Sequence, residues 1–440
     1  MGFLSLFGCA AAALAALVAG SFLLPGPWVW LIGPPWIAYD TWLAVHHLRR
    51  GLLAVQSPEP VSDRGGPALS VLIAAHNEAA GILPCLAALG LGPEDEAIVI
   101  DDGSDDGTPA LVANAWRLTW GTCDAHGVRW ATAPGVAVRV LSQPRAGKAR
   151  ALNRALAEAR HPVVVTIDGD TVLGPGALAA LRAAFVNDAG LTAACGILDP
   201  CGPNGTAAGW WVWCQRREYA RAFLWRAGWA ADRMLVLVPG AFAAYDTAAV
   251  RAVGGFATDS QVEDYELMYR LNRARPGTRA VVVAGARART EVPTALGPFL
   301  RQRRRWFGGF IAVLWQYRAM VGDRRHGALG TWHLRIKTVD TLLPLYGVAA
   351  IAVLAVIWFR DGRIGLGVLG LFALKMGVDA WIQARAARAV ARWQGLPVPH
   401  WPGSMAASVI EQMTFQPLRQ LGAALGWVVL AARATGGGRW

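Results

Sequence analysis

Long stretches of apolar residues stand at both ends of this 440-residue chain. Residues 3–24 carry no charged side chain and are long enough to cross about 30 Å of hydrocarbon as a helix. A second apolar stretch, residues 29–45, is followed by two histidines and two arginines within residues 46–50, and the positive-inside rule therefore predicts that the next segment is cytoplasmic. A cleaved signal peptide is the alternative for residues 3–24, but a basic start is missing and more apolar sequence follows at once.

The C-terminal part repeats this pattern. Residues 338–359 and 364–384 each predict a membrane span, and Lys375 and Asp379 stand four apart, so they can pair across one helical turn. The sequence leaves open whether residues 403–432 span the membrane, re-enter it or lie flat. The predicted organisation is N-terminal membrane segments with two spans (1–50), a Pro- and Gly-containing linker (51–67), a cytoplasmic catalytic domain (68–295), amphipathic interface helices (296–337) and two or three C-terminal membrane segments (338–440).

Between the apolar ends, short apolar runs recur roughly every 30 residues, with Ala- and Leu-rich, helix-compatible sequence between them. This spacing is typical of βαβ units and predicts an α/β fold with a mainly parallel, Rossmann-like sheet, flanked by transmembrane and interfacial helices. The four runs are LSVLIAA (69–75), AIVI (97–100), VAVRVL (136–141) and VVVTI (163–167).

Composition is too apolar for an ordinary soluble enzyme and too charged for a pure transporter. Hydrophobic residues make up 54% of the chain and the net charge is +12, carried by 39 Arg and 3 Lys. Much of the positive charge lies in residues 273–305 or beside apolar stretches, where it meets a membrane surface, and a role in nucleic-acid binding is therefore not expected. The six cysteines form no CxxC pair and fit a reduced, cytosol-facing domain.

Acidic residues follow three of the four predicted strands. Glu78 comes after the first strand, Asp101 and Asp102 after the second, and Asp168 and Asp170 after the fourth. Ligands bind at the carboxyl ends of strands in an open parallel sheet, so these side chains predict a shared acidic rim. Such a rim is costly unless a cation or hydrogen-bond donors offset it.

Asp168-Gly169-Asp170 is the natural cation site. Two carboxylates two residues apart can hold a hard divalent ion while its other positions stay open for diphosphate oxygens. A simple turn is the alternative, because Asp and Gly favour turns. The carboxylates of Asp101 and Asp102 can likewise accept hydrogen bonds from a uracil or ribose, or belong to a turn only.

Three further sequence motifs carry groups that a transfer reaction needs. Lys148 follows a glycine at a predicted helix start, where it can meet a phosphate, although a solvated lysine fits equally there. Asp264, with Glu263 beside it, is the candidate general base for an attacking hydroxyl; an acidic helix N-terminus is the alternative. Arg305 can neutralise a leaving diphosphate and Trp306 can face a sugar ring, while a basic membrane-surface helix explains some of these arginines.

In this order the motifs resemble those of the family-2 glycosyltransferases with the GT-A fold, in the membrane-bound processive branch of cellulose, chitin, hyaluronan and poly-N-acetylglucosamine synthases. The resemblance covers residues 69–309. It implies a UDP-sugar donor, magnesium or manganese, inversion and a β-linkage. The implied roles are uridine binding by Glu78 and Asp102 with Asp101 in support, phosphate contact by Lys148, metal contact by Asp168 and Asp170, catalysis by Asp264 beside Glu263, and acceptor and diphosphate contact by Gln302, Arg305 and Trp306.

Two departures from the family pattern leave the identity of the acceptor open. Val262 replaces a common threonine before the acidic pair, and Tyr245-Asp246 stands where a basic residue is common. The expected product is a β-linked polysaccharide made from UDP-N-acetylglucosamine or UDP-glucose at the cell membrane by a multi-pass protein. Transfer of one sugar to a lipid acceptor is the alternative, and an inactive membrane scaffold or transporter subunit is an alternative of another class. Membrane lipid and an accessory membrane or export subunit are the other expected partners.

Overall fold

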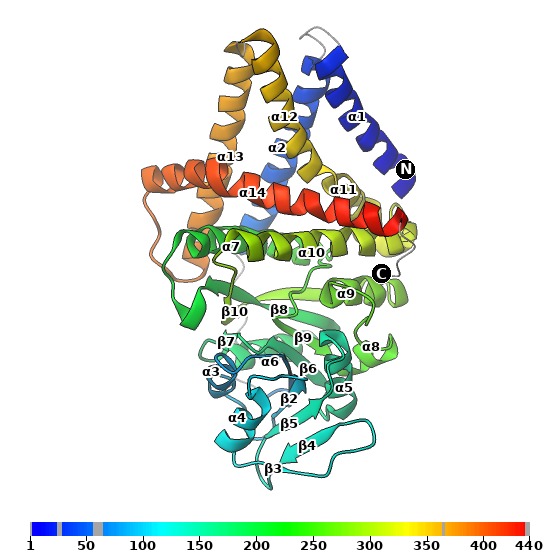
Figure 1. The fold of residues 1–440 in the computed structure, drawn as a ribbon, viewed down its shortest axis with the longest axis vertical. Coiled ribbons are helices and arrows are strands. Elements are labelled where there is room, and N and C mark those ends of the chain that lie inside the picture. The colour runs from blue at the N-terminus through cyan, green and yellow to red at the C-terminus, as the bar shows by residue number, and fades with distance from the viewer. Residues whose placement is uncertain (1, 24–28, 56–64, 363–365, 436–440) are drawn as a thin grey trace. The chain divides into compact units, whose positions relative to one another are not determined.

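The computed structural model describes residues 2–23, 29–55, 65–362 and 366–435 (Figure 1). Most of the predicted linker 51–67 and the Pro-Gly-Pro sequence at 25–27 lie outside these residues. The chain divides into two compact units, which are described one at a time. Unit 1 comprises Met1–Ser57, Ala220–Met234 and Ala295–Trp440; unit 2 comprises Pro58–Tyr219 and Leu235–Thr294.

Unit 2 is built on one ten-stranded sheet in the order β3-β4-β5-β2-β1-β6-β9-β8-β10-β7. The neighbours β5, β2, β1 and β6 are parallel, as are β8 and β10, whereas β4, β9 and β7 run the other way. The strands are β1 (Leu69–Ala75), β2 (Glu96–Asp102), β3 (Thr119–Trp120), β4 (Arg129–Thr132), β5 (Val138–Gln143), β6 (Val163–Asp168), β7 (Val172–Leu173), β8 (Leu191–Cys201), β9 (Phe242–Asp246) and β10 (Arg279–Glu291).

The prediction of an α/β fold with a mainly parallel sheet is confirmed, and the four predicted runs form β1, β2, β5 and β6. The central residues of these strands are mostly apolar because the strands are covered on both faces: Val71, Leu72 and Ile98 are fully buried. Each such side chain contributes about 1.5–3 kcal/mol on burial. The helices around the sheet are α3 (Ile82–Ala87), α4 (Thr108–Ala115), α5 (Lys148–Glu158), α6 (Ala177–Asn187), α8 (Thr247–Ala252), α9 (Glu263–Ala274) and a 3₁₀ turn (Pro203–Gly205).

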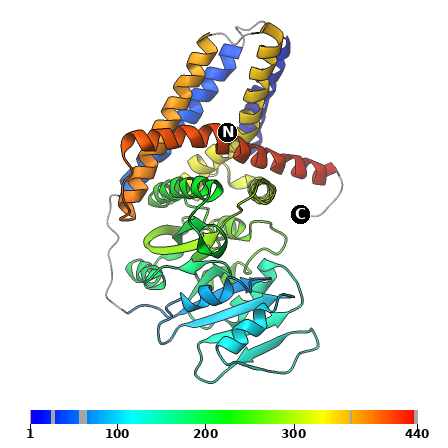
Figure 2. The same ribbon diagram turned by 60° about the vertical axis from the view of Figure 1, so that its left-hand side comes forward.

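Unit 1 is helical (Figures 1 and 2). Helix α2 packs along α13, α1 packs along α12, and the long α14 crosses both α12 and α13 and lies against α10. The helices are α1 (Phe3–Leu23), α2 (Val29–Ala54), the part of α7 (Trp210–Ala231) from Ala220, α10 (Leu296–Gln316), α11 (Leu334–Asp340), α12 (Leu343–Asp361), α13 (Leu366–Trp393) and α14 (Trp401–Thr435), with short turns at Arg318–Met320, Arg324–His326 and Leu329–His333.

One buried and one half-buried ion pair join helices of unit 1. Arg221 of α7 makes a two-pronged contact with the fully buried Glu411 of α14. The predicted pair of Lys375 and Asp379 forms at 2.5 Å, and Asp40 of α2 joins it at 2.6 Å from the lysine. A lone buried charge is far more costly than a matched one, so these contacts fix which helices lie together.

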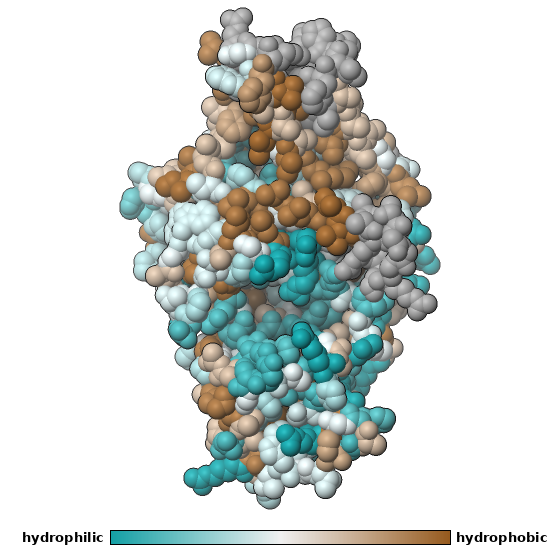
Figure 3. Space-filling model, viewed as in Figure 1, coloured by the Kyte–Doolittle hydropathy of each residue, from teal (hydrophilic) through white to brown (hydrophobic). Residues whose placement is uncertain are grey.

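The surface of unit 1 is apolar where α12 and the adjoining stretch of α14 reach it (Figure 3). Ile351 and Trp358 of α12 are 55% and 54% exposed, and Val428 of α14 is 61% exposed. Among the described residues, one helical stretch, Leu329–Val356, is both long and apolar enough to cross a membrane, and Phe3–Ala16 is apolar but shorter. The other predicted spans stay predictions.

Candidate active site

Two loops at the carboxyl ends of β1 and β2 interlock and position Glu78. The Glu78 amide donates to the hydroxyl of Thr108 at 2.9 Å, and the Asn77 amide donates to that of Ser104 at 2.9 Å. Asn77 adopts the left-handed region (φ 59°), which asparagine tolerates, and its side-chain oxygen accepts from the amide of Asp105. The register of β1 and β2 therefore places Glu78 at the sheet edge beside the second acidic loop.

Asp102 serves as an anchor for the next loop. Its carboxylate accepts hydrogen bonds from the Gln143 side chain and from the amides of Ala146 and Gly147, each at 2.8 Å. Asp102 is only 5% exposed. The carboxylate that was predicted to hold uridine is therefore already engaged by the protein.

Asp101 is likewise occupied by the protein. Its oxygens accept from the Ser104 amide at 3.1 Å and from the Ser142 hydroxyl at 3.0 Å, and the residue is 1% exposed. Uridine contact by Asp101 stays a prediction. In the structure, the carboxylates of Asp101 and Asp102 both hold neighbouring loops through hydrogen bonds.

Lys148 joins two of the predicted acidic motifs. Gly147, at φ 96° in a conformation that favours glycine, precedes the first residue of α5, which is Lys148. The Lys148 ammonium lies 2.5 Å from Asp168 and 3.4 Å from Glu263. Burial opposes the charge of Lys148, but these two carboxylates outweigh it and raise its pKa. One cation thus links the end of β6 to the start of α9.

Asp170 is held by two threonines that the sequence analysis did not single out. The hydroxyls of Thr171 and Thr290 lie 3.1 and 3.3 Å from the same oxygen of Asp170 and 3.1 Å from one another. Both threonines are buried. Thr290 comes from β10, which pairs with β7 directly after the Asp168–Asp170 turn, and only this tertiary pairing brings it to the site.

Glu78 lies against the same turn. A Cβ atom at Gly169 would lie 2.9 Å from Cγ of Glu78, so the glycine permits this close approach. Burial, and then the charges of Asp170 and Asp168, raise the pKa of Glu78 to about 7. Burial and the charge of Asp168 likewise raise the pKa of Asp170 to about 6.

This crowding of negative charge suits a hard divalent cation. Carboxylate oxygens are the ligands that magnesium and manganese accept, and a cation offsets both the burial and the repulsion that raise the pKa values of Glu78 and Asp170. Among the described residues, no three His, Cys, Asp or Glu side chains are already arranged as a metal-binding group. Asp168 and Asp170 therefore fit a metal by their chemistry, and metal binding stays a prediction.

Asp264 is fixed in the first turn of α9. Its carboxylate accepts from the Gly240 amide at 2.7 Å and from its neighbour Tyr265 at 2.8 Å. Burial, followed by the charge of Glu263, raises the pKa of Asp264 although the two amides oppose the shift. Tyr245, which the sequence marked only as a departure from the family pattern, is fully buried, and its burial, followed by the charge of Asp264, raises its pKa.

Gln302, Arg305 and Trp306, which the sequence predicts to contact the acceptor and the diphosphate, belong to α10 of unit 1. Within that unit the buried Arg303 lies over the rings of Phe299 and Trp306, at 4.8 and 4.5 Å from their centres. Arg305 is exposed and Gln302 is half-buried. Their predicted contact with the diphosphate and the acceptor stays a prediction.

Two family descriptions match this chain. Residues 70–225 match Glycosyl transferase family 2, and residues 163–374 match Glycosyl transferase family group 2. A chitin synthase of Meloidogyne artiellia is 26% identical over 239 residues, which are 50% of this chain and 12% of that protein. The chain therefore spans about an eighth of this relative's length.

A solved structure resembles the chain over most of its length. The mannosyltransferase PcManGT from Pyrobaculum calidifontis, in complex with GDP-Man and Mn²⁺, superimposes with a TM-score of 0.58 at 19% identity, covering 93% of this chain and 99% of that one. At this identity the likeness concerns the fold. Together with the sheet, it shows a GT-A-like α/β fold.

The chain carries family 2 glycosyltransferase domains. The partial likeness to a chitin synthase supports its place in the processive, synthase-like branch.

Replacing Asp102 tests its role as an anchor. Asp102→Ala leaves the side chain of Gln143 and the amides of Ala146 and Gly147 without their acceptor. Of these, Gln143 is buried, and a buried group left unpaired costs about 1–3 kcal/mol. We expect a lower Tm and weaker donor binding, because the loop no longer holds Lys148. The control is Asp105→Ala, whose exposed side chain has no such task. Equal Tm values for the two variants would contradict the anchor.

Glu78 gives a prediction for the pH dependence of stability in metal-free protein. A carboxyl group whose pKa is higher in the folded state destabilises the fold as pH rises from its ordinary value near 4.5 to about 7. Glu78→Gln should therefore be about as stable as the parent at pH 4.5 and about 1–2 kcal/mol more stable at pH 8. Thermal unfolding in a chelator between these pH values measures the difference, and a constant difference would argue against the raised pKa.

Proposed function

We propose that this protein transfers a sugar, with inversion, from a nucleoside-diphosphate sugar to an acceptor hydroxyl and forms a β-linkage. The observation that carries the proposal is the Lys148 ammonium, which lies between Asp168 at the end of β6 and Glu263 beside Asp264. Residues from β6, α5 and α9 thus form one charged cluster, although Lys148 and Glu263 lie more than a hundred positions apart in the sequence. Donor activation and acceptor deprotonation require groups of this kind in one place.

Asp264 is the proposed base. It takes the proton of the acceptor hydroxyl as the acceptor oxygen bonds to the anomeric carbon, while the bond from that carbon to the diphosphate breaks and its electron pair leaves with the diphosphate. The raised pKa of Asp264 suits it to accept a proton near neutral pH. Glu263 supports this role because its charge contributes to the shift.

Asp168 and Asp170 are the proposed holders of magnesium or manganese. The bound ion would supply charge neutralisation for the departing diphosphate. The hydroxyls of Thr171 and Thr290 hold the Asp170 carboxylate in one orientation by hydrogen bonds to the same oxygen. Lys148 exchanges part of its contact with Asp168 for the phosphates, and Arg305 of α10 is the proposed second cation for the leaving group.

A UDP-sugar such as UDP-N-acetylglucosamine or UDP-glucose is the proposed donor, and a growing glycan is the proposed acceptor. Support comes from the resemblance to processive synthases and from the matched chitin synthase. A GDP-sugar is a second candidate, because the solved neighbour binds GDP-Man. Glu78 and the Asp101–Asp102 loop are the proposed surroundings of the nucleoside.

We also propose that unit 1 embeds the protein in the cell membrane as a multi-pass protein with unit 2 in the cytoplasm. Support comes from the span-length helix Leu329–Val356, from the apolar α1 and from the exposed apolar residues of α12. Single transfer to a lipid remains the alternative acceptor chemistry. Product size separates the two, because a long glycan and a single-sugar lipid differ on a sizing column.

A donor screen with a base variant tests the transfer reaction. Purified protein in detergent is given each UDP- and GDP-sugar in turn with Mg²⁺ or Mn²⁺ and an acceptor extract, and release of free nucleotide is measured. Asp264→Asn should lower release by about 10²–10⁴-fold with the preferred donor, while the donor Kd changes little. The matched control is Asp259→Asn, an exposed carboxylate in the preceding loop. Full turnover by Asp264→Asn would remove Asp264 as the base.

The cation site has its own test. Asp170→Ala should shift the Mn²⁺ concentration for half-maximal donor binding upward by at least about tenfold, since one carboxylate ligand is lost. Titration calorimetry of donor at several Mn²⁺ concentrations gives this value without any turnover. An unchanged metal requirement would exclude Asp170 as a ligand.

A further inference from the structure

The exposed face of α14 is uncharged over the whole stretch 401–430. Exposed positions recur there at helical spacing: Trp401, Pro402, Ala406, Val409, Ile410, Met413, Thr414, Leu421 and Val428. Ile410, Met413 and Val428 are each exposed by more than half. The one hydroxyl among these side chains, that of Thr414, donates to the carbonyl oxygen of Ile410 at 2.6 Å and therefore needs no water.

The polar residues of α14 face the protein instead. Ser404, Ser408 and Glu411 are buried, and Glu411 accepts both hydrogen bonds of Arg221 from α7. Gln416 donates to Glu411 at 3.0 Å. A helix on the surface of a water-soluble protein has the reverse arrangement, with its polar side chains outward. Polar groups that are satisfied inside the protein, with apolar groups outside, suit a helix that borders hydrocarbon.

Helix α14 runs across the other helices of unit 1 rather than along one of them (Figures 1 and 2). It meets a different helix about every two turns. The contacts are Gln412 with the carbonyl oxygen of Met376 in α13, Gln420 against Gly347 in α12, and the ring of Trp427 with that of Phe7 in α1. Seven or eight residues cover about 10–12 Å of helix, close to the distance at which neighbouring helices pack.

The crossing lies near one end of α1 and α12. Beyond it, α1 continues from Phe7 to Leu23 and α12 from Gly347 to Asp361. These lengths correspond to about 24 and 21 Å, whereas the hydrocarbon of a bilayer is about 30 Å thick. The remaining 5–10 Å, roughly, is the depth to which a helix lying in the interface buries its apolar face. The lengths of α1 and α12 therefore suit a position of α14 at one face of the membrane.

Helix α10 packs against another side of α14 and carries positive charge. Gly308 and Gly426 permit this packing, because a Cβ atom at Gly426 would lie 2.7 Å from the amide nitrogen of Gly308. Arg301 and Arg304 of α10 are exposed. Exposed arginines beside an apolar helix are typical of the cytoplasmic face of a membrane, where the lipid surface is negatively charged.

We propose that α14 lies flat in the cytoplasmic face of the membrane and that acyl chains of one leaflet cover its exposed side. The inference rests on the membrane location given under the proposed function. A second copy of the chain is the competing cover for the same face. Lipid is favoured because the apolar surface of α14 continues onto the exposed apolar residues of α12, so one apolar surrounding serves both helices (Figure 3).

The test measures the depth of spin labels on the full chain in lipid nanodiscs, from collisions with oxygen and with a water-soluble nickel complex. The exposed Cys9 and Cys123 are first replaced by serine, and one cysteine is then introduced at a time. Labels at Val409→Cys, Leu421→Cys and Val428→Cys should all lie about 5–10 Å below the headgroup boundary. A spanning α14 would separate the first and the last by about 28 Å.

Helix α12 provides the matched control. Val348, Ile351 and Ala355 are exposed on a helix that is proposed to span the membrane. Labels at Val348→Cys, Ile351→Cys and Ala355→Cys should therefore differ in depth from one another, because the helix rises about 1.5 Å per residue. Asp105→Cys, in an exposed loop of unit 2, is the control for a label in water.

Three results would overturn the inference. The first is a depth that changes progressively from Val409 to Val428. The second is a set of α14 labels that the nickel complex reaches as readily as the label at Asp105, which would mean that water covers the helix. The third is a set of α14 labels that neither reagent reaches, which would mean a protein cover such as a second copy. If a label at one position disturbs the fold, Ile410→Cys and Met413→Cys report on the same face.

The α12 labels separate a failure of this inference from a failure of the proposed function. Depth is measured without donor or acceptor, so a failed donor screen leaves the result unchanged. If the labels on α12 also lie in water, the proposed membrane location is wrong. If they lie in hydrocarbon while the labels on α14 do not, the membrane location stands and only the flat position of α14 is wrong.

Discussion

The structure of unit 2 depends on how it accommodates several carboxylates at one edge of a sheet. Parallel strands bring the acidic ends of β1, β2 and β6 together, and mutual repulsion there is costly. The chain offsets this cost in three ways. Backbone amides hold Asp102, threonine hydroxyls hold Asp170, and the ammonium of Lys148 holds Asp168.

These contacts also divide the carboxylates by task. Those that are satisfied by the protein, such as Asp101 and Asp102, organise loops and set the start of α5. Those whose pKa is raised, Glu78, Asp170 and Asp264, retain unfavourable charge that a cation, a donor or a proton can relieve. The candidate reaction site and the loops that support it are thus built from the same residue type. The number of hydrogen-bond donors around each carboxylate determines whether it holds a loop or keeps a raised pKa.

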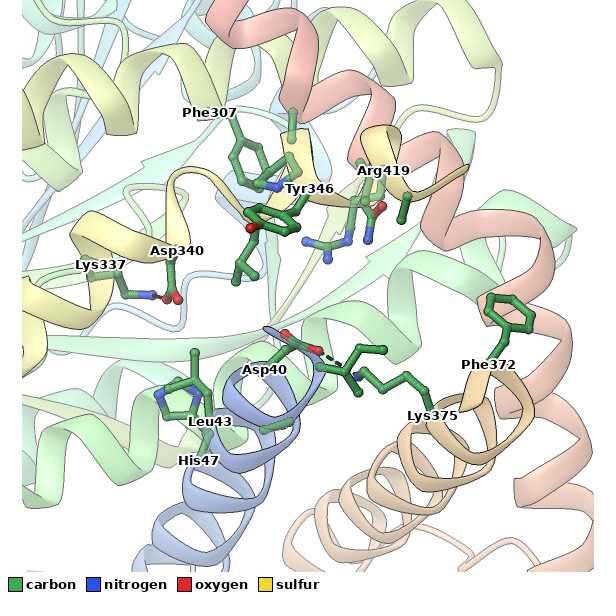
Figure 4. Close-up of a pocket in the computed structure, with 18 of the residues that line it drawn as sticks. Asp40, Leu43, His47, Phe307, Lys337, Asp340, Tyr346, Phe372, Lys375 and Arg419 are labelled. Carbon is green, nitrogen blue, oxygen red and sulfur yellow. Dashed lines mark hydrogen bonds and ion pairs between the residues drawn. The ribbon is translucent and has the colours of Figure 1, made fainter. Parts of the chain in front are cut away.

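In unit 1 the same physics acts in apolar surroundings. Arg221 with Glu411, and Lys375 with Asp40, pair charges from different helices, and each pair is tolerable only while both members are present. Such pairs specify which helices meet, whereas the apolar side chains around them pack with little directional preference. Asp40 and Lys375 also line a cavity of about 550 Å³ among the helices of this unit (Figure 4).

The sequence determined the fold class, the strands β1, β2, β5 and β6, and the order of the acidic motifs, because apolar runs of strand length and glycine-rich turns are local signals. The pairing of Lys375 with Asp379 was equally local, since both lie on one helical face. Only the tertiary structure decided that Lys148 bridges Asp168 and Glu263 and that Thr290 supports Asp170. Those partners come from strands and helices far apart in the chain, and no periodicity in the sequence encodes which distant hydroxyl or ammonium will meet a given carboxylate.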